Sequence, residues 1–397
     1  MNTENRYVVL LLMVATMLLL AACGTPQPTA TEPLVAVDTT APTDTLLPTD
    51  TPIPTEPPAA PTQTPEPQPE DRTWPTKRES FAMAYHPQID RVLLFCGYDE
   101  FVSAHAWRPE MEDMKARDEW AYDVGANRLE PWTVVPAVIY QQAVYDSLSQ
   151  ALISFGPQNT RVYNTATRTW EKTNPAEEPR RDRYWADLAY DSQSDRIILF
   201  GGFADGPDLQ DTWAYDYETN TWTEMTPAVS PERRFGHAMA YDAESDRVIL
   251  WGAHEEGALP MSEEEKATVW AYDYESNTWT AMESTGGPSY RGHHTMVYHP
   301  GTDRIILFGG HSLGDLNFSD ETWAYDYNSN TWTQLTPATH PSGRRFHSMV
   351  YDEAADRMVL FGGIAGTWLK EEINDELWIF DPVTDEWSQV TPDSLNP

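Results

Sequence analysis

One short stretch recurs along the chain and limits what the chain can fold into. It is an apolar run that Arg usually precedes and glycine usually follows, and its copies stand at residues 91–97, 151–156, 196–202, 247–253, 304–310 and 357–363. The tyrosines that precede these copies lie 45 to 60 residues apart. This spacing is near the period of propeller blades and far from that of helical solenoids. We therefore divide the chain into six repeated units.

Each unit holds four short segments of strand-forming residues. They resemble HAMAY at 237–241, IILF, WAYD and TWTEM, and they are too short and too rich in aromatic and β-branched residues to be helices. The first two segments are apolar at nearly every residue, as strands covered on both faces must be. The fourth alternates with Thr and Glu, which is typical of a half-exposed outer strand. We expect the four strands of each sheet to follow one another outward from a central axis.

A longer motif connects these segments with a known family. The apolar strand ends in Gly-Gly, and an aromatic residue is later followed after six residues by Trp, as in Tyr163/Trp170, Tyr215/Trp222, Tyr272/Trp279, Tyr325/Trp332 and Phe380/Trp387. This pattern resembles the kelch motif over about residues 74–390. The resemblance implies an all-β fold, a six-bladed kelch-type β-propeller with four antiparallel strands per blade. The second unit should be the least regular, because it lacks both the second glycine and the preceding Arg.

The repeated glycines and aromatic residues also have physical roles. A glycine pair at a strand end permits positive φ and close approach of the backbone. The Trp and Tyr side chains should fill the space between sheets, with the indole N–H and phenol O–H reaching polar partners. The seam between the sixth and first units should be the weakest, unless residues 71–75 add to an outer edge.

The amino terminus has the pattern of an export signal. Residues 8–20 form an apolar run that is too short to span a bilayer and that follows Arg6. The run ends in Leu-Ala-Ala-Cys at Cys23, which resembles a lipoprotein signal: residues 1–22 would be removed and Cys23 acylated. The alternative is an ordinary cleaved signal that happens to contain a cysteine. Either interpretation predicts an exported protein that faces the cell exterior or the periplasm.

Residues 23–73 have the composition of a linker. Between residues 24 and 73 there are 13 Pro and 13 Thr and no aromatic residue, so this stretch cannot bury enough apolar surface to fold. Proline-rich chain extends by about 3.1 Å per residue, which makes a disordered stalk of up to roughly 150 Å. We expect the propeller at 74–397, with a lipid anchor as its contact with the membrane.

Charge and cysteine content limit the partners. The formal net charge of −36 excludes a general nucleic-acid binder, because phosphate contacts need a basic surface. With Cys23 acylated, Cys96 has no partner for an intrachain disulfide. We expect a monomer without a cofactor.

Loop lengths identify one face as a candidate binding site. The connection between the first and second segments has the same length in all six units, whereas that between the second and third varies widely. Because antiparallel strands alternate in direction, the variable loops gather at the end where each first strand begins. Binding often uses variable loops on a rigid scaffold. Arginines stand at equivalent positions there: Arg78, Arg183, Arg234, Arg291 and Arg344.

These arginines have two interpretations. A fork of guanidinium donors suits a carboxylate or phosphate, and the kelch resemblance implies the same, since some kelch domains hold acidic peptide segments with arginines at this position. Alternatively, each arginine pairs with an acid or a carbonyl of a neighbouring blade and holds the ring together.

Histidines lie close to the same positions. His237 and His294 open the first strands of successive units, and His254 and His311 follow the glycine positions. Antiparallel pairing would bring His237 toward His254 and His294 toward His311, as pairs that suit zinc or copper. In kelch strands, which these residues resemble, a histidine three residues after Arg more often bonds the backbone. We therefore predict no metal.

Two tryptophans in the variable loops are further candidates. Trp107 lies in the longest loop, which should fold over the second unit, and Trp368 lies in the loop of the sixth unit. Each is either a platform for a sugar or a buried anchor of its loop.

The function that we expect is noncatalytic. The chain would be a surface-tethered binding or scaffolding module for a protein or glycan ligand, possibly anionic, on the arginine-lined face. The alternative is a carbohydrate-active enzyme, either galactose-oxidase-like or a mutarotase. A galactose-oxidase-like enzyme needs a Cys cross-linked to a Tyr. Cys96 does not suit this role, because it stands where other repeats have a structural glycine. A mutarotase needs an Arg with a carboxylate such as Glu255 or Glu256.

Overall fold

The structure is a computed structural model. It describes residues 73–98, 118–134, 142–156, 159–204, 208–253, 268–284, 286–312 and 315–396. Residue contacts divide the chain into a unit of residues 1–64 and a unit of residues 65–397, and all described residues belong to the second. In the described part no helix is long and apolar enough to cross a bilayer. The expected signal peptide, Cys23 and the linker up to residue 72 lie outside the described residues.

The described residues form six four-stranded antiparallel sheets, one per repeat, with the strands in chain order. The first repeat contains β1 (Ala82–His86), β2 (Arg91–Phe95), β3 (Asp118–Asp123) and β4 (Arg128–Val134). The second contains β5 (Gln142–Asp146), β6 (Ala151–Gly156), β7 (Asn159–Asn164) and β8 (Thr169–Lys172). The third contains β9 (Asp187–Asp191), β10 (Arg196–Gly202), β11 (Leu209–Asp216) and β12 (Thr221–Met225).

The later repeats follow the same plan. The fourth contains β13 (Ala238–Asp242), β14 (Arg247–Trp251), β15 (Val269–Asp273) and β16 (Thr278–Met282). The fifth contains β17 (Thr295–His299), β18 (Arg304–Phe308), β19 (Thr322–Asp326) and β20 (Thr331–Leu335). The sixth contains β22 (Ser348–Asp352), β23 (Arg357–Phe361), β26 (Leu377–Asp381) and β27 (Glu386–Val390). A small sheet of β21 (Arg344–Arg345), β24 (Ile364–Thr367) and β25 (Lys370–Ile373) joins this repeat, and η3 (Pro392–Ser394) follows it.

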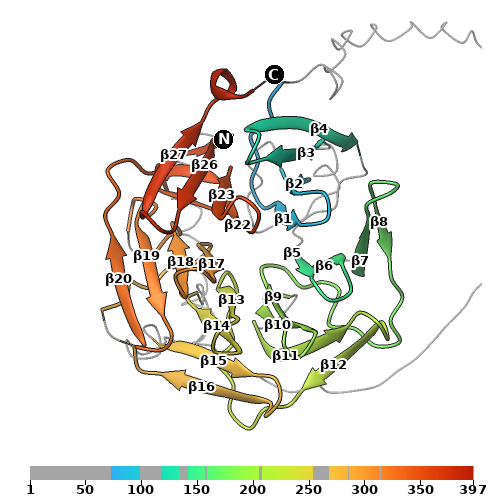
Figure 1. The fold of residues 1–397 in the computed structure, drawn as a ribbon. Helices are drawn as coiled ribbons and strands as arrows, with labels where there is room; N and C mark the ends of the chain where they lie inside the picture. Colours follow the sequence, from blue (N-terminus) through green and yellow to red (C-terminus); the bar gives the residue numbers. More distant parts are fainter. Residues whose placement is uncertain are drawn as a thin grey trace, which may run out of the picture. The chain divides into compact units, whose positions relative to one another are not determined.

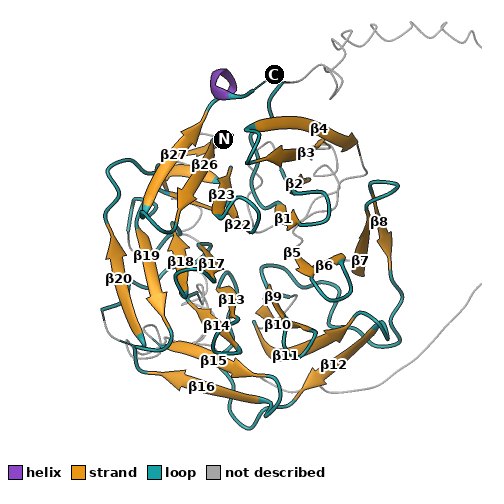
Figure 2. Cartoon of the chain, in the orientation of Figure 1, coloured by secondary structure: helices purple, strands orange, loops and turns teal. Residues whose placement is uncertain are grey.

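The first strand of each sheet contacts the first strand of the next. These inner strands are β1, β5, β9, β13, β17 and β22, and β22 also contacts β1. Figures 1 and 2 show them close to a common centre, with the fourth strands farthest out. The second strands are buried on both faces, as β14 is from Val248 to Trp251, whereas the outer strand β16 alternates between exposed and buried residues. The predicted order of the strands, from covered to half-exposed, is confirmed.

The predicted Tyr and Trp positions join neighbouring repeats. Tyr215 and Trp222 face each other across β11 and β12, with ring centroids 4.9 Å apart. The Trp222 indole Nε1–H donates to Thr160 Oγ1 of the preceding repeat at 2.8 Å, and the Tyr215 hydroxyl donates to Asn220 Oδ1 at 2.9 Å. The expectation that these polar groups find partners is confirmed for Tyr215 and Trp222, whereas the buried Trp332 indole N–H has no hydrogen-bond partner within the described part of the chain.

Both ends of the described chain contribute to the seam between the sixth and first repeats. The Trp74 indole donates to the Asp375 carbonyl at 2.9 Å, in the connection between β25 and β26. At the other end, the backbone N–H of Asn396 donates to the backbone carbonyl of Asn127 at 2.9 Å, in the hairpin of β3 and β4. The addition of residues 71–75 to an outer edge is not formed by residues 73–75, which make no strand. Trp74 bonds a loop of the sixth repeat instead, and residues 71 and 72 lie outside the described residues.

Candidate binding site at the loop end of the inner strands

The two ends of the inner strands differ in what surrounds them. Their first residues lie beside the loops that follow the second strands, and we call this the loop end. Their last residues lead into tight turns to the second strands, and we call this the hairpin end. The predicted arginines, the predicted Trp368 and an axial cavity are all at the loop end.

The five predicted arginines are buried and bonded within their own repeats. Each donates from Nη1 to the carbonyl 18 residues later, at the end of the second strand, over distances of 2.5 to 3.4 Å; the acceptors are Cys96, Gly201, Gly252, Gly309 and Gly362. The arginine side chains are at most 2% exposed. The guanidinium groups therefore clamp the first strand of a repeat to the end of its second strand.

Three of these arginines also hold a carboxylate of the same repeat. Arg183 pairs with Asp211 at 2.5 Å, Arg291 with Glu321 at 2.5 Å, and Arg344 with Glu376. Although burial acts in the opposite direction, bonding to Arg183 holds the pKa of Asp211 below its usual value. These charges are compensated inside the protein.

The burial and bonding of the arginines decide between their two interpretations. Recognition of an anionic ligand requires donors that reach solvent, whereas these guanidinium groups are enclosed and bonded. The geometry favours the structural alternative, with one correction: the side chains bond within the repeat. It is the backbone carbonyl of the arginine that reaches the neighbouring repeat, as Arg234 O does in accepting the Gly202 N–H at 2.8 Å.

Two residues after each of these arginines the backbone turns left-handed. The residues are Ser80, Trp185, Gly236, His293 and Phe346, with φ between 50° and 65°; we call them the left-handed ring. Consecutive members are joined by backbone N–H···O bonds: Gly236 to Trp185 (2.9 Å), His293 to Gly236 (2.7 Å), Phe346 to His293 (3.2 Å) and Ser80 to Phe346 (3.3 Å). These bonds fix the same backbone conformation in five repeats while the side chain differs in each.

The aromatic members of the left-handed ring form a cluster. The centroids of His293 and Phe346 lie 4.0 Å apart, and Trp185 lies 5.6 Å from His293 and 6.2 Å from Phe346. Trp185 also stacks on Phe235 at 5.6 Å. Aromatic side chains from four different repeats thus meet at the loop end of the inner strands.

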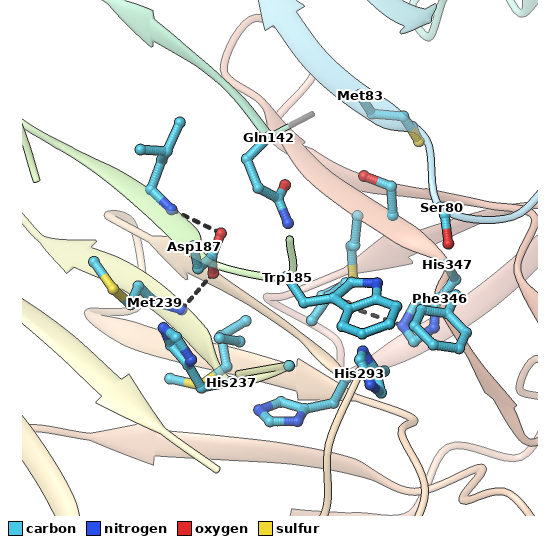
Figure 3. A pocket seen from close by; sticks show the side chains of 18 of the residues that line it. Ser80, Met83, Gln142, Trp185, Asp187, His237, Met239, His293, Phe346 and His347 are labelled. Carbon is cyan, nitrogen blue, oxygen red and sulfur yellow. Dashed lines mark hydrogen bonds between the residues drawn. The ribbon is translucent and has the colours of Figure 1, made fainter. Parts of the chain in front are cut away.

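An axial cavity of about 190 Å³ lies beside this cluster. Figure 3 shows Trp185, His293 and Phe346 along one side of it, with Asp187 and Gln142 from the neighbouring inner strands. A water needs about 10–15 Å³ of such volume, so the cavity accommodates on the order of a dozen waters or a side-chain-sized group. Ligand sites commonly combine an apolar wall with a few polar groups in this way.

Asp187 is the carboxylate on the cavity wall. Its Oδ1 accepts the Leu188 N–H at 2.9 Å, and its Oδ2 accepts the Met239 N–H of the next inner strand at 2.7 Å. Desolvation raises the pKa of Asp187 to about 7, although these two N–H groups act in the opposite direction. Within the described chain it has no ion pair. The carboxylate is thus held in place by backbone groups but lacks a compensating charge.

The predicted histidines pack between repeats. His237 lies edge-on to Phe200, and His294 lies edge-on to Trp251, each ring belonging to the preceding repeat. Burial lowers the pKa of both histidines well below the usual value, so they are neutral at pH 7. Phe81 occupies the equivalent position in the first repeat and packs on Phe361 in the same way, which indicates a packing role.

The predicted pairing of histidines is not formed among the described residues. His311 stacks on His293 of the left-handed ring, with centroids 5.4 Å apart, and does not pair with His294. His254 lies outside the described residues. Among the described side chains, the group with the spacing of metal ligands is Asp242, Glu244 and Asp303 at the hairpin end, and exposed acidic groups of this kind are common without an ion.

Trp368 lies at the turn between β24 and β25. Its ring is 37% exposed, and it covers the Arg345 guanidinium at 4.2 Å and the edge of His311 at 5.0 Å. Arg345 in turn donates to Glu371 at 2.8 Å. Trp368 is therefore packed on Arg345 and His311 and is partly exposed, and its role as a platform for a sugar stays a prediction. Trp107, Glu255 and Glu256 lie outside the described residues.

The left-handed ring is what the sequence interpretation missed. Its positions carry no repeated residue type, so a pattern of repeated residues does not reveal them. One signal was present: the fourth repeat has Gly236 two residues after its arginine, and glycine at a repeated position suggests positive φ. Applying that spacing to the other repeats would have identified Trp185, His293 and Phe346.

Comparison with known proteins agrees with this architecture. Residues 150–286 and 226–397 match the family described as the KLHDC2/KLHL20/DRC7 Kelch-repeats domain. The chain belongs to the kelch-repeat family. Its fold is a β-propeller-like all-β fold built of kelch repeats.

Individual relatives are more distant. Kelch domain-containing protein 3 from Bos taurus and its counterpart from Homo sapiens are each 26% identical over 226 residues, which is 51% of this chain and 56% of theirs. Adagio-like protein 3 from Oryza sativa subsp. japonica is 26% identical over 227 residues, 55% of this chain and 35% of that protein. The kelch chain thus spans about half the length of the first two curated relatives.

Proposed function

We propose that this kelch chain is a closed six-bladed propeller that binds a protein ligand at its loop end without catalysis. Closure is supported by the contacts between successive inner strands, including that of β22 with β1. Membership in the kelch family supports a binding or scaffolding role. The loop end is supported by the cavity and by the aromatic cluster beside it.

The distribution of exposed apolar side chains carries this proposal. In the described part, seven large apolar side chains are more than a third exposed. Five of them lie at the loop end, Phe203, Val229, Leu316, Trp368 and Leu369, and two at the hairpin end, Leu148 and Val383. Leu316 and Trp368 are neighbours, since the Trp368 N–H donates to the Leu316 carbonyl at 3.0 Å. Contiguous exposed apolar groups are typical of surfaces that bind another protein.

The location of the protein belongs to the same proposal. We propose that Cys23 is acylated and that the Pro/Thr-rich segment holds the propeller away from the membrane. Replacement of Cys23 by Ser should move the protein from the membrane fraction to the soluble fraction. Retention of the Cys23→Ser protein in membranes would contradict the lipid anchor.

Two leucines of similar exposure provide a matched test of the binding surface. Leu369 is 61% exposed at the loop end, and Leu148 is 68% exposed at the hairpin end. The full-length protein and its Leu369→Arg and Leu148→Arg variants would be screened on arrays of proteins and glycans. We expect specific protein binding that Leu369→Arg abolishes and Leu148→Arg leaves unchanged. Equal loss with both variants would contradict binding at the loop end.

The same screen distinguishes the remaining functions. If the protein binds glycans and no proteins on the arrays, its ligand is a carbohydrate and not a protein. Turnover of a sugar panel, measured as mutarotation or oxidation, would contradict a noncatalytic module. A mutarotase that used Arg291 or Arg344 would need open guanidinium groups, whereas both are bonded to acids and carbonyls of their own repeats.

A further inference from the structure

The left-handed ring carries large side chains where the backbone favours glycine. A left-handed conformation costs a residue with a side chain roughly 1 kcal/mol, and glycine avoids that cost. The fourth repeat has Gly236 there, while Trp185, His293 and Phe346 occupy the same conformation with φ between 52° and 55°. The backbone does not require aromatic residues at these positions. Strain of this kind is a reason to look for a function of the side chains.

The aromatic residues enclose a site with a single sign of charge. Trp185 and Phe346 line the cavity with aromatic rings, whose faces carry a negative quadrupole, and Asp187 lines it with a carboxylate. The Arg345 guanidinium already lies over the Phe346 ring, 4.9 Å from its centroid. Three of the nearby cations are paired with acids, and Arg78 and Arg234 donate to backbone carbonyls. Arg183 is bonded to Asp211, Arg344 to Glu376, and Arg345 to Glu371.

Three histidines that line the cavity, His237, His294 and His347, add no positive charge at neutral pH. Burial is the largest effect on His237, His294 and His347, and it lowers the pKa of each, to about 3 for His347. The protein as a whole carries a formal charge of −36, which raises the local concentration of cations and repels anions. An anionic ligand would meet the Asp187 carboxylate, which is the acidic side chain on the cavity wall.

We propose that the axial cavity binds a cationic side chain, an arginine or lysine of a protein ligand, with Asp187 as its charge partner and Trp185 and Phe346 as its aromatic walls. This inference rests on the proposed function and specifies its ligand. Aromatic rings and a carboxylate are the groups that recognise ammonium and guanidinium ions. The approximate volume of 190 Å³ suits one such side chain together with some water.

Blocked amino acids test the inference directly. N-acetyl-arginine methylamide would be titrated into the full-length protein by calorimetry, beside the citrulline analogue, which has nearly the same shape without the charge. We expect saturable binding of the arginine compound and at least tenfold weaker binding of the citrulline compound. Asp187→Asn should weaken arginine binding at least tenfold, to the level of citrulline.

The other end of the same strand offers the control. Asp191 terminates β9 at the hairpin end, where its Oδ1 accepts two backbone N–H groups of the turn. Asp191→Asn removes the same charge and retains that oxygen, so it should change arginine binding less than twofold.

Three results would overturn the inference. They are equal binding of arginine and citrulline, equal effects of the two Asp→Asn changes, and no saturation by blocked arginine or blocked lysine up to 10 mM. The first and third need only the wild-type protein, so they hold even where a variant does not fold. Protein binding that Leu369→Arg abolishes but Asp187→Asn does not would leave the proposed function standing and remove only the cationic side chain.

Discussion

The two ends of the inner strands use the same unusual backbone conformation for different purposes. At the hairpin end the residue before each second strand is left-handed, with φ between 52° and 56°, and it is Asp in five repeats and Gln150 in the other. In each of those five repeats a tyrosine hydroxyl donates to the aspartate, as Tyr241 does to Asp246 at 2.9 Å. At the loop end the members of the left-handed ring are Ser, Trp, Gly, His and Phe.

This difference separates what the fold needs from what the site needs. Asp tolerates the left-handed region better than most residues, and its bond to tyrosine stabilises the turn. Repetition of one residue at one backbone position therefore indicates a structural role. Where the backbone conformation repeats but the residue type varies, the side chain serves a purpose other than folding.

The largest effect should come from a loop-end residue that is repeated. Arg344→Ala removes the donor to the Gly362 carbonyl and the cation paired with Glu376, which keeps only the Trp378 indole N–H as a side-chain donor; this should lower the free energy of unfolding by about 3 kcal/mol. Arg180→Ala is the control, because Arg180 is 47% exposed in its pair with Asp182, and it should cost less than about 1 kcal/mol. Urea unfolding measures both. Equal stability of Arg344→Ala and wild type would contradict the clamp.

The second effect concerns Asp187 and depends on pH. Because desolvation raises its pKa from 3.8 to about 7 in the folded protein, the folded state holds the proton more tightly than the unfolded state. The resulting destabilisation is absent below about pH 4, grows between pH 4 and 7, and is complete above pH 7.

Removing this carboxylate should therefore change how stability depends on pH. Relative to wild type, Asp187→Asn should gain roughly 2 kcal/mol of stability between pH 4 and pH 8, a figure reduced for partial solvation. The loss of the bond to the Met239 N–H lowers stability at both pH values and does not alter this difference. Urea unfolding at pH 4 and pH 8 measures the stability difference between Asp187→Asn and wild type. If this difference does not depend on pH, the pKa of Asp187 is not raised in the folded protein.

A smaller effect should come from the hairpin end. Tyr298→Phe removes the hydroxyl that donates to Asp303 at 3.0 Å, which should lower stability by about 1 kcal/mol. Ligand binding should be unchanged, since this bond lies at the end opposite the cavity. Loss of binding in Tyr298→Phe would mean that the two ends are not independent.

The smallest effect compares glycine at the two ends. Ser80→Gly relieves a left-handed residue and should stabilise the protein by about 0.5 kcal/mol. Asp246→Gly relieves the same strain but loses the bond from Tyr241, so its net effect should be destabilising. Thermal unfolding of the two variants ranks them. If both change stability in the same direction, the structural distinction between the two ends fails.

The sequence predicted the repeated features well, because repetition makes them visible. The four strands per repeat, the buried second strands and the pairing of residues such as Tyr215 and Trp222 all follow from patterns that recur. The arginines were found in the same way. Their bonding was left open, because the residue type does not reveal whether a guanidinium group points to solvent or to a carbonyl 18 residues away.

The candidate site was harder to predict for the opposite reason. Its residues differ between repeats, and what unites Trp185, His293 and Phe346 is a backbone angle and a chain of N–H···O bonds between repeats. Asp187 became a candidate only when the inner strands placed it beside the cavity. Such groupings depend on contacts between residues far apart in sequence, which residue type and spacing do not encode.

We infer that the variable left-handed ring and Asp187 select a ligand, whereas the repeated hairpin end supports the fold. A peptide array probed with full-length wild type, Asp187→Asn and Tyr298→Phe tests this division. Wild type and Tyr298→Phe should favour the same arginine- or lysine-containing peptides, and Asp187→Asn should lose this preference. Identical peptide profiles for all three proteins would contradict this division.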